Sequence, residues 1–368
     1  MADPASFSVP LRSLPEVGPI APVVLGAMSF ERLEPGHGRS DASYDAVFEA
    51  AREAGITAID TAPLYGFGVS ERVVGAWLRR TGAPMRVFTK VGLRWDDAHG
   101  DVLFETRGED GRPVVVRRDG RPESVRLEIE RSLERLGVPR LGLVQVHHRD
   151  PRVPIDETMG ALVDAWREKK LEAVGVSNFR GDEVELAARA VERASHGALR
   201  LACTQDLYNL LSREAERDVV PALRARGLGF LAFSPLAQGL LTGAMGPDRE
   251  VCDWRARTPL FSPANRRTIQ AAVERELAPL ARRYGVSPAA IALAWVLTRE
   301  HVTAAIVGAR DAAQLRSSVA ALSLVGEPRR IDLHALARIG DAFAGLTLST
   351  TPSLAARIGA RVRRLFGR

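Results

Sequence analysis

The chain has 368 residues, of which 46% are hydrophobic and 26% are charged, and these proportions exclude a disordered or a fibrous protein. The formal net charge is +6, but five of the 51 basic residues and none of the 45 acids fall within residues 342–368. The rest of the chain is therefore close to neutral, and we expect no nucleic-acid partner.

Short, nearly continuous hydrophobic runs alternate with longer amphipathic stretches along most of the chain. Such runs are typical of parallel strands that helices cover. We predict eight strands, at residues 23–26, 57–60, 87–90, 143–147, 173–178, 201–206, 230–235 and 304–308.

The stretches between the strands have the hydrophobic spacing of helices. We predict helices at residues 40–54, 70–80, 122–136, 155–170, 182–194, 213–226, 268–284 and 312–322. Ser40 and Asp41 are suitable N-cap residues, and glycines follow several helices where a helix normally ends: Gly55, Gly137, Gly227 and Gly285. Eight β–α units predict an α/β fold, a single (β/α)8 TIM barrel over residues 1–345, with a doubly wound sheet as the alternative.

Three insertions interrupt this alternation. Residues 93–120 contain two strand-like runs, 102–106 and 113–118, around a turn sequence that predicts a hairpin. Residues 238–267 are rich in glycine, proline and charge, and 287–299 predict an extra helix. The first two insertions follow strands, so in a barrel they extend the rim where active sites lie.

Residues 346–368 form a basic tail beyond the predicted barrel. Ile358, Val362, Leu365 and Phe366 fall on one face of a helix, with the arginines mostly elsewhere. We favour a helix that packs on the barrel or a solvated end, because Gly359 weakens a helix. The alternative is an amphipathic helix that touches an anionic membrane.

Two cysteines, Cys203 and Cys252, are too few for a disulfide framework or a four-cysteine metal site, so we expect reduced thiols and no metal. The N-terminus has no basic segment before an apolar stretch, which argues against a secretory signal. The least polar stretches are too short to span a bilayer. We therefore expect a cytoplasmic protein.

Polar residues stand at the ends of the predicted strands, and in a barrel these ends share one rim. They include Asp60, Lys90 and His147, and Tyr65 follows Asp60 closely. A tyrosine is a poor acid at neutral pH, but a nearby ammonium lowers the pKa of its hydroxyl. With a histidine to orient a carbonyl oxygen, this set can transfer a proton to that oxygen. A reduction also needs a cofactor, because no side chain supplies a hydride.

Six motifs in order, within a stretch from about residue 23 to residue 322, resemble those of the aldo-keto reductase superfamily. They are Ile-Asp-Thr-Ala-Pro-Leu-Tyr-Gly from 59, Phe-Thr-Lys from 88, Leu-Val-Gln-Val-His from 143, Val-Gly-Val-Ser-Asn-Phe from 174, Gln-Asp-Leu-Tyr-Asn from 205 and Phe-Ser-Pro-Leu-Ala-Gln-Gly from 233, followed by Val-Gly-Ala-Arg from 307. The resemblance implies a barrel that binds NADP(H) and reduces aldehydes or ketones.

By the same resemblance, Tyr65 is the proton donor, Lys90 and Asp60 tune it, and His147 orients the carbonyl. Alternation along the strand puts His147 on the same face as Gln145, and His148 on the other. The residues expected at the cofactor are Gly26, Ser29, Asp60, Ser177, Asn178, Gln205, Phe233, Ser234, Leu236, Gln238, Gly239, Gly308, Arg310, Gln314 and Ser318.

Three positions depart from the family pattern. Phe233 replaces a tyrosine that stacks on the nicotinamide, and stacking survives that change. Ser318 stands where an asparagine often follows Gln314 by four residues. The 93–120 insertion is longer than in many members, and we expect it to shape the substrate site.

Cofactor choice depends on a cation near the adenosine ribose. Arg310 suits the 2′-phosphate of NADP, and Arg316 can add charge if it points inward, whereas Asp311 weakens the local field. We expect NADP(H) to be preferred and NAD(H) to be accepted.

The substrate is expected to be a small carbonyl compound or a sugar. Two alternatives to a reductase are a cofactor-binding regulatory or channel-partner protein with negligible turnover, and a sugar dehydrogenase that works in the oxidative direction. Signatures of short-chain dehydrogenases, serine hydrolases, zinc proteases and P-loop proteins are missing from the sequence.

Overall fold

Eight parallel strands close into a barrel in the computed structural model, which describes residues 10–30, 41–108, 110–251, 254–326 and 331–350. Around the barrel the strands follow the order β10, β11, β12, β13, β3, β4, β5 and β9. Their bounds are β3 Val23–Gly26, β4 Ala58–Asp60, β5 Arg86–Val91, β9 Leu143–Val146, β10 Val174–Ser177, β11 Leu201–Leu207, β12 Gly229–Phe233 and β13 Ala304–Gly308. The predicted barrel and all eight predicted strands are thereby confirmed.

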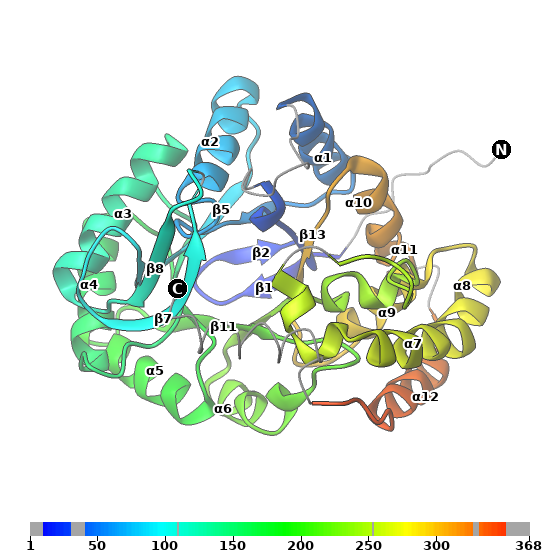
Figure 1. Ribbon diagram of the computed structural model, residues 1–368. Helices are drawn as coiled ribbons and strands as arrows, with labels where there is room; N and C mark the ends of the chain where they lie inside the picture. Colours follow the sequence, from blue (N-terminus) through cyan, green and yellow to red (C-terminus); the bar gives the residue numbers. More distant parts are fainter. Residues whose placement is uncertain (1–9, 31–40, 109, 252–253, 327–330, 351–368) are drawn as a thin grey trace.

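Helices surround the barrel and bury its outer face, as Figure 1 shows along the barrel axis. They are α1 Asp41–Glu53, α2 Val69–Thr81, α3 Pro122–Leu136, α4 Ile155–Arg167, α5 Gly181–Ser195, α6 Val219–Arg226, α7 Pro263–Ala272, α8 Ala278–Tyr284, α9 Pro288–Leu297, α10 Ala312–Val319, α11 Leu322–Val325 and α12 Leu333–Ala344. Gly137 and Gly285 end α3 and α8 in the left-handed conformation, with φ of 64° and 65°, as their positions predict.

Prolines explain two differences between the predicted and the observed helices. The predicted helix 213–226 is split into a short 3₁₀ turn, η2 (Glu214–Glu216), and α6, because Pro221 suits only the first turn of a helix. The predicted helix 268–284 instead consists of α7, a π-helical turn η6 (Val273–Leu277) and α8. Pro279 has no N–H to donate, and beside it the N–H of Ala278 bonds back to Val273.

A short antiparallel hairpin covers the end of the barrel where the strands begin. Its strands are β1 (Arg12–Leu14) and β2 (Gly18–Ile20), and Leu14 and Ile20 are fully buried in the barrel interior. Arg12 donates hydrogen bonds to the carbonyls of Leu297 and Val302, at 2.7 and 2.8 Å. No local sequence pattern predicts this hairpin, because strands of three residues are too short to show alternation.

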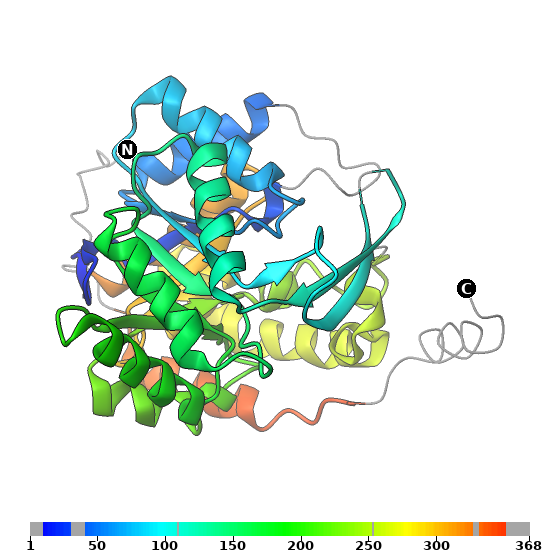
Figure 2. The same ribbon diagram turned by 90° about the vertical axis from the view of Figure 1, so that its left-hand side faces the viewer.

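A three-stranded sheet lies at the opposite end of the barrel, as Figure 2 shows. It consists of β6 (Leu93–Arg94), β8 (Pro113–Arg118) and β7 (Asp101–Arg107), in that order across the sheet. The predicted hairpin is therefore confirmed, with β7 slightly longer than expected. Gly111, with φ of 75°, allows the tight turn between its strands.

The long segment after β12 contains only short turns of 3₁₀ helix before α7. They are η3 (Ala237–Thr242), η4 (Trp254–Arg257) and η5 (Pro259–Phe261). The predicted extra helix is α9, whereas α12 was not predicted, although its N-cap Asp332 and its buried Leu336, Ile339 and Phe343 follow helical spacing. Ser40, Cys252 and most of the basic tail, residues 351–368, lie outside the described residues.

Within the described part of the chain, no helix has the length and apolar character needed to cross a membrane.

Candidate active site

A buried ion pair joins the ends of two neighbouring strands. The Lys90 ammonium on β5 lies 2.6 Å from a carboxylate oxygen of Asp60 on β4 and 3.0 Å from the carbonyl of Thr61. Both side chains are almost fully buried, at 1% and 3% exposure. Burial alone lowers the pKa of Lys90, but the charge of Asp60 and the interaction with Tyr65 raise it on balance. Lys90 therefore keeps its positive charge at neutral pH.

Two amide side chains from other strands also contact Asp60 inside the barrel. Gln205 Nε2 on β11 donates to Asp60 at 2.8 Å, and Gln145 Nε2 on β9 lies 3.4 Å away. Gln205 Nε2 also lies 3.2 Å from Gln145 Oε1. Gln205 was predicted at the cofactor, whereas Gln145 was not predicted to have a role. Its position two residues before His147 on the inward face could have indicated one.

Tyr65 lies in the turn after β4, above the ion pair. The Lys90 ammonium is 5.1 Å from the centre of the Tyr65 ring, and the His147 ring meets Tyr65 edge-on with 6.1 Å between centres. The turn is held by backbone hydrogen bonds from Tyr65 to Ala62 and from Ser70 to Tyr65, at 3.1 and 3.2 Å. The structure thus brings together the four residues predicted for proton transfer: Asp60, Tyr65, Lys90 and His147.

The two adjacent histidines stack on one another with 5.5 Å between ring centres. Burial, and then the charges of Lys90 and His148, lower the pKa of His147 well below its ordinary value. Burial and the charge of Arg118 lower the pKa of His148 to about 4. Both rings are therefore neutral at neutral pH. Neither ring nitrogen of His147 bonds to another described residue, so both are available to a ligand.

Polar groups on β10 and β11 expose acceptor oxygens at the same rim. Asn178 Nδ2 donates to the carbonyl of His147 and to Ser177 Oγ, both at 3.0 Å. The Gln205 amide nitrogen is likewise bound to Asp60 and Gln145. The amide oxygens of Asn178 and Gln205 carry no such bond among the described residues. A ligand that donates N–H groups, such as a carboxamide, fits this set.

Two glycines lie side by side where β3 and β13 end. Gly26 pairs with Gly308 in the barrel, and a Cβ on Gly26 would lie 3.0 Å from the Ile306 side chain. Ser29, just after β3, donates to the carbonyl of Ala309 at 2.8 Å. This edge of the rim therefore has little side-chain cover, which suits the approach of a ligand to the backbone.

The backbone after β12 adopts the left-handed conformation repeatedly. Ser234, Ala237, Gln238 and Gly239 have φ of 51°, 47°, 54° and 100°. Residues other than glycine seldom adopt this conformation. Successive backbone N–H groups in such conformations can form concavities that bind anions. The partly buried Phe233 and Leu236 belong to the same segment.

Two residues that sequence analysis missed brace this segment from outside. Asn209 Nδ2 donates to the carbonyl of Ser234, and Arg255 Nη1 donates to the carbonyl of Gln238, both at 3.0 Å. Asn209 follows a predicted strand end, so its place at the rim could have been inferred. No local signal distinguishes Arg255 from the many other arginines of the chain.

The start of α10 carries the residues predicted at the adenosine end of the cofactor. Arg310 is exposed, and Gln314 accepts a hydrogen bond from its backbone N–H at 3.1 Å, while Ser318 is buried. Asp311 caps α10 by accepting from the Gln314 N–H at 2.8 Å. Arg316 does not point inward, because it pairs with Glu53 of α1 at 2.9 Å.

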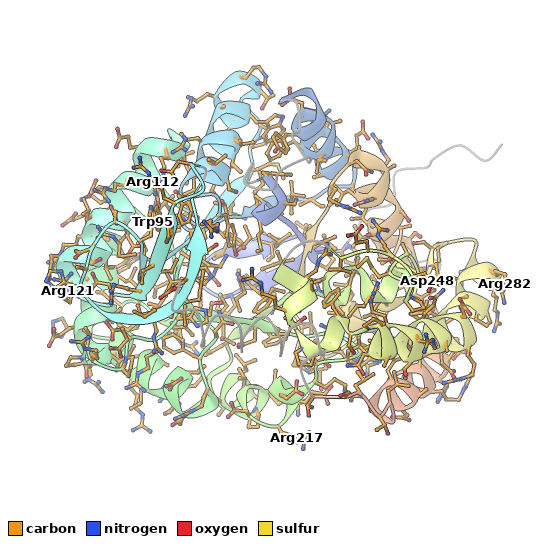
Figure 3. All side chains as sticks on the ribbon, viewed as in Figure 1. Trp95, Arg112, Arg121, Arg217, Asp248 and Arg282 are labelled. Carbon is orange, nitrogen blue, oxygen red and sulfur yellow. The ribbon has the colours of Figure 1, made fainter. Side chains whose placement is uncertain are left out.

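Two aromatic rings flank the catalytic candidates on the side of the three-stranded sheet. Phe67 and Trp95 lie with 5.2 Å between ring centres, and Trp95 lies beside the β7–β8 ribbon in Figure 3. Phe67 follows Tyr65 by two residues, and Trp95 follows Lys90 by five. These rings give one side of the rim an apolar wall.

The predicted cofactor residues follow the C-terminal ends of β3, β4, β10, β11, β12 and β13, which share one rim in a parallel barrel. They supply glycine backbone, acceptor amides, a left-handed backbone segment and an exposed arginine. This donor and acceptor set fits a nicotinamide dinucleotide.

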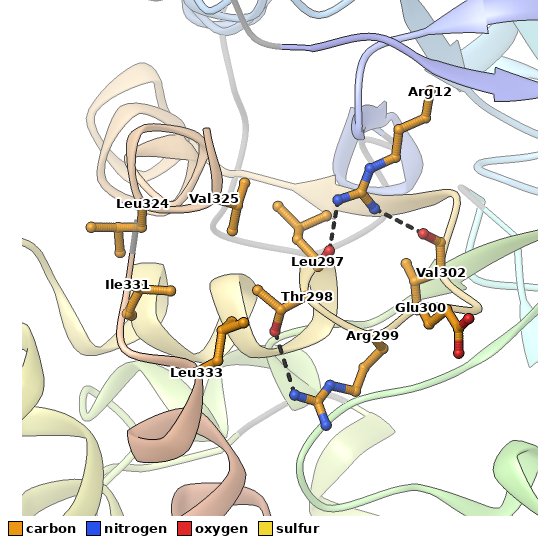
Figure 4. Close-up of a pocket in the computed structure, with 10 residues that line it drawn as sticks. All are labelled: Arg12, Leu297, Thr298, Arg299, Glu300, Val302, Leu324, Val325, Ile331 and Leu333. Atoms are coloured by element: carbon orange, nitrogen blue, oxygen red, sulfur yellow. Dashed lines mark hydrogen bonds between the residues drawn. The ribbon is translucent and has the colours of Figure 1, made fainter. Parts of the chain in front are cut away.

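A separate surface pocket of about 340 Å3, lined by Arg12, Leu297, Val302 and others, lies next to the start of β13, away from this rim (Figure 4).

Comparison with known proteins agrees with this geometry. Residues 22–332 match the Aldo/keto reductase family. The chain is 35% identical over 273 residues to Aldo-keto reductase YhdN of Bacillus subtilis (strain 168), which covers 73% of this chain and 75% of that protein. It is 32% identical over 284 residues to the NADH-specific methylglyoxal reductase of Escherichia coli (strain K12), covering 76% and 82%.

Among solved structures, the chain is similar to the glycerol dehydrogenase AKR11B4 from Gluconobacter oxydans. The TM-score is 0.76 at 29% identity, and the match covers 94% of this chain and 99% of that one. The similarity extends over the barrel, its rim and most of the sequence. The chain therefore belongs to the aldo/keto reductase family and is an NAD(P)-dependent oxidoreductase.

Proposed function

We propose that the protein is an NADPH-preferring reductase of aldehydes or ketones in which Tyr65 is the proton donor. The observation that supports this most is the buried Lys90–Asp60 pair at 2.6 Å, with its ammonium 5.1 Å from the Tyr65 ring. An ion pair at this depth is weak as a source of stability. It is well suited to hold a positive charge next to a phenol, and so to tune an acid.

The reaction divides between the side chains and the cofactor. The chemistry that a bound reduced nicotinamide supplies is hydride transfer to the carbonyl carbon. Tyr65 would give its hydroxyl proton to the carbonyl oxygen as negative charge develops there. Because Tyr65 and Lys90 interact, the ammonium stabilises the phenolate that remains. Neutral His147 can donate one hydrogen bond to the same oxygen and fix its position.

Replacing Tyr65 by phenylalanine tests the mechanism. The Tyr65→Phe protein should bind NADPH normally, as followed by nucleotide fluorescence, and should lose about 10²–10⁴-fold in turnover. Lys90→Met should shift the pH profile of turnover, because it removes the charge next to the phenol. Turnover of Tyr65→Phe within a few fold of the unmodified protein would refute the assignment.

Arg310 supports a preference for NADPH, because an exposed guanidinium suits a phosphate. The carboxylate of Asp311 caps α10 beside it, which keeps a negative charge close by. The NADH-specific relative of Escherichia coli makes the test necessary. Arg310→Ala should raise the KM for NADPH roughly ten- to a hundredfold and barely change that for NADH. Equal changes for both nucleotides would assign Arg310 another role.

A second candidate is oxidation of a polyol or a sugar, and the similarity to a glycerol dehydrogenase favours it. The same residues can run the reaction backwards, with Tyr65 as the base. A panel of carbonyl compounds, polyols and sugars, assayed with both nucleotides in both oxidation states, separates the two directions. A protein that turns over none of them would favour the regulatory alternative, which the complete set of Asp60, Tyr65, Lys90 and His147 argues against.

A further inference from the structure

Arg118 lies at the end of β8, directly beside the segment that follows the catalytic strand β5. It pairs with Leu93 across the sheet, and the next residue, Asp119, donates its N–H to the carbonyl of Gly92 at 3.1 Å. By alternation, the Arg118 side chain shares a face with fully buried Val116. Arg117, on the other face, donates to Gly100. Arg118 therefore points to the buried side of the sheet.

Gly92 lies next to both Asp119 and the adjacent histidines, since a Cβ on Gly92 would be 3.9 Å from the Asp119 carbonyl oxygen and 3.8 Å from the His148 carbonyl oxygen. The charge of Arg118 acts on His148, whose pKa it helps to lower. His148 stacks on His147, and His147 meets Tyr65, with 5.5 and 6.1 Å between the successive ring centres. The end of β8, which carries Arg118, is thus next to His148, and the two stacked imidazole rings continue from there to Tyr65. An anion beside Arg118 would lie within reach of one small molecule that also touches Tyr65.

The Arg118 guanidinium has no partner among the described residues. Its Nε is buried without a hydrogen bond, and it makes no ion pair. The acids around it are bound to other groups: Asp119 to Arg121, Asp101 to Arg152, and Asp150 to the N–H groups of Gly120 and Arg152. Arg94, in the same sheet, is by contrast paired in the usual way: its guanidinium donates hydrogen bonds to Asp96 and Ser124.

A buried donor without a partner is unfavourable, and each one in a native structure calls for an explanation. Arg149, Arg266 and Arg299 also have a buried Nε without a partner, but their other guanidinium nitrogens donate hydrogen bonds, whereas those of Arg118 bond to no described residue. Guanidinium groups match carboxylates and phosphates, to which they can donate two parallel hydrogen bonds. Neutral His148 can add one more donor, whereas Phe67 and Trp95 supply an apolar wall nearby. The surroundings of Arg118 therefore suit an anion attached to an apolar body.

We propose that Arg118, with His148 beside it, binds an anionic group of the substrate, so that the preferred substrates are carbonyl compounds that carry a carboxylate. This inference rests on the proposed reductase function and names the substrate class of the same site. It adds a recognition residue from the 93–120 insertion, distinct from the residues that transfer the proton.

Carboxybenzaldehydes test the proposal, because a rigid ring separates their two functional groups. We would compare kcat/KM for benzaldehyde, for the three carboxybenzaldehyde isomers and for methyl 4-formylbenzoate. At least one carboxylated isomer should exceed the neutral aldehydes roughly tenfold or more. Arg118→Met should lower kcat/KM for that isomer roughly ten- to a hundredfold and leave the neutral aldehydes nearly unchanged.

Arg112→Met is the matched control, because Arg112 is an exposed arginine in the turn of the same hairpin (Figure 3). It should change neither class of substrate. If Arg118→Met lowered kcat/KM by the same factor for neutral and carboxylated aldehydes, the proposal would be overturned. Equal kcat/KM values for the two classes in the unmodified protein would also overturn it.

Calorimetric binding of terephthalate to the protein is an independent readout that needs no turnover. Binding that disappears in Arg118→Met but persists in Arg112→Met and in Tyr65→Phe supports the anion site. Absence of binding in the unmodified protein overturns it. If no carbonyl compound is reduced while terephthalate still binds through Arg118, the proposed function fails and the anion site stands.

Discussion

Glu128 of α3 offers a quantitative test of the electrostatics beneath the rim. Its carboxylate is 3% exposed and accepts a hydrogen bond from the Gly92 N–H at 2.9 Å, two residues after Lys90. Burial raises the pKa of Glu128 to about 8, against an ordinary value of 4.5. The Gly92 N–H and Arg94 oppose this shift, whereas Asp119 and Glu71 add to it.

The sign of the pH dependence follows from the proton balance. Between pH 4.5 and 8 the folded protein holds the Glu128 proton and the unfolded chain has lost it, so stability falls as the pH rises. Below this window both states are protonated, and above it both are ionised. Each pKa unit corresponds to about 1.4 kcal/mol, so the free energy of unfolding falls by on the order of 3–5 kcal/mol across this pH range.

Glu128→Gln keeps the shape of the side chain and the acceptor for Gly92, but it cannot ionise. We would measure the free energy of unfolding of both proteins by urea titration from pH 5 to pH 8.5. The value for Glu128→Gln minus the value for the unmodified protein should increase by about 3 kcal/mol across this range. Glu134→Gln, at an exposed position of the same helix, should run parallel to the unmodified protein within about 0.5 kcal/mol.

A difference between the Glu128→Gln and unmodified curves that does not vary with pH would refute this reasoning. The comparison isolates Glu128 from other groups in the same range, such as Asp206, whose pKa burial raises to about 7. Those groups contribute equally to both proteins and cancel in the difference.

Two glycines and the buried ion pair provide further predictions. Gly75→Ala should destabilise by about 1–3 kcal/mol, because its Cβ would lie 2.5 Å from the Leu136 carbonyl oxygen, whereas Gly160→Ala, with open space, should stabilise by about 0.5–1 kcal/mol. Thermal unfolding measures both, and equal losses would contradict the contact argument. Asp60→Asn should cost about 3–5 kcal/mol in urea unfolding, because it leaves the Lys90 ammonium buried without its counter-charge. Adding Lys90→Met should recover part of this loss, and a further additive loss would exclude the explanation.

The barrel could be predicted because its strands are buried on both faces. Such strands give continuous hydrophobic runs that stand out from the amphipathic helices between them. The hairpin of β1 and β2 could not be predicted in this way, since Leu14 and Ile20 bury themselves against residues from distant strands. Its stability comes from contacts that no local pattern records.

The candidate site could be predicted to the extent that it lies at strand ends. A parallel barrel brings the ends of all its strands to one rim, so Asp60, Lys90 and His147 follow from position alone. The partners of a charged side chain could not be predicted in this way. Arg94 and Arg118 each have an aspartate within two residues, yet Arg94 bonds to Asp96 and to Ser124 of α3, whereas Asp119 bonds to Arg121 and Arg118 has no partner among the described residues. Which arginine an aspartate binds therefore depends on the folded geometry and not on the spacing in the sequence.

The bonds from Arg12 to the carbonyls of Leu297 and Val302 join segments 285 and 290 residues apart in the chain. At about 5–20 residues per second, a ribosome needs roughly 15–60 s to make that separation. During this time Leu14 and Ile20 lack the strand that completes their surroundings, and the seam between β3 and β13 stays open. The nascent protein therefore exposes apolar surface and unpaired strand edges until translation is nearly finished, and during this time it is more prone to aggregation than the closed barrel.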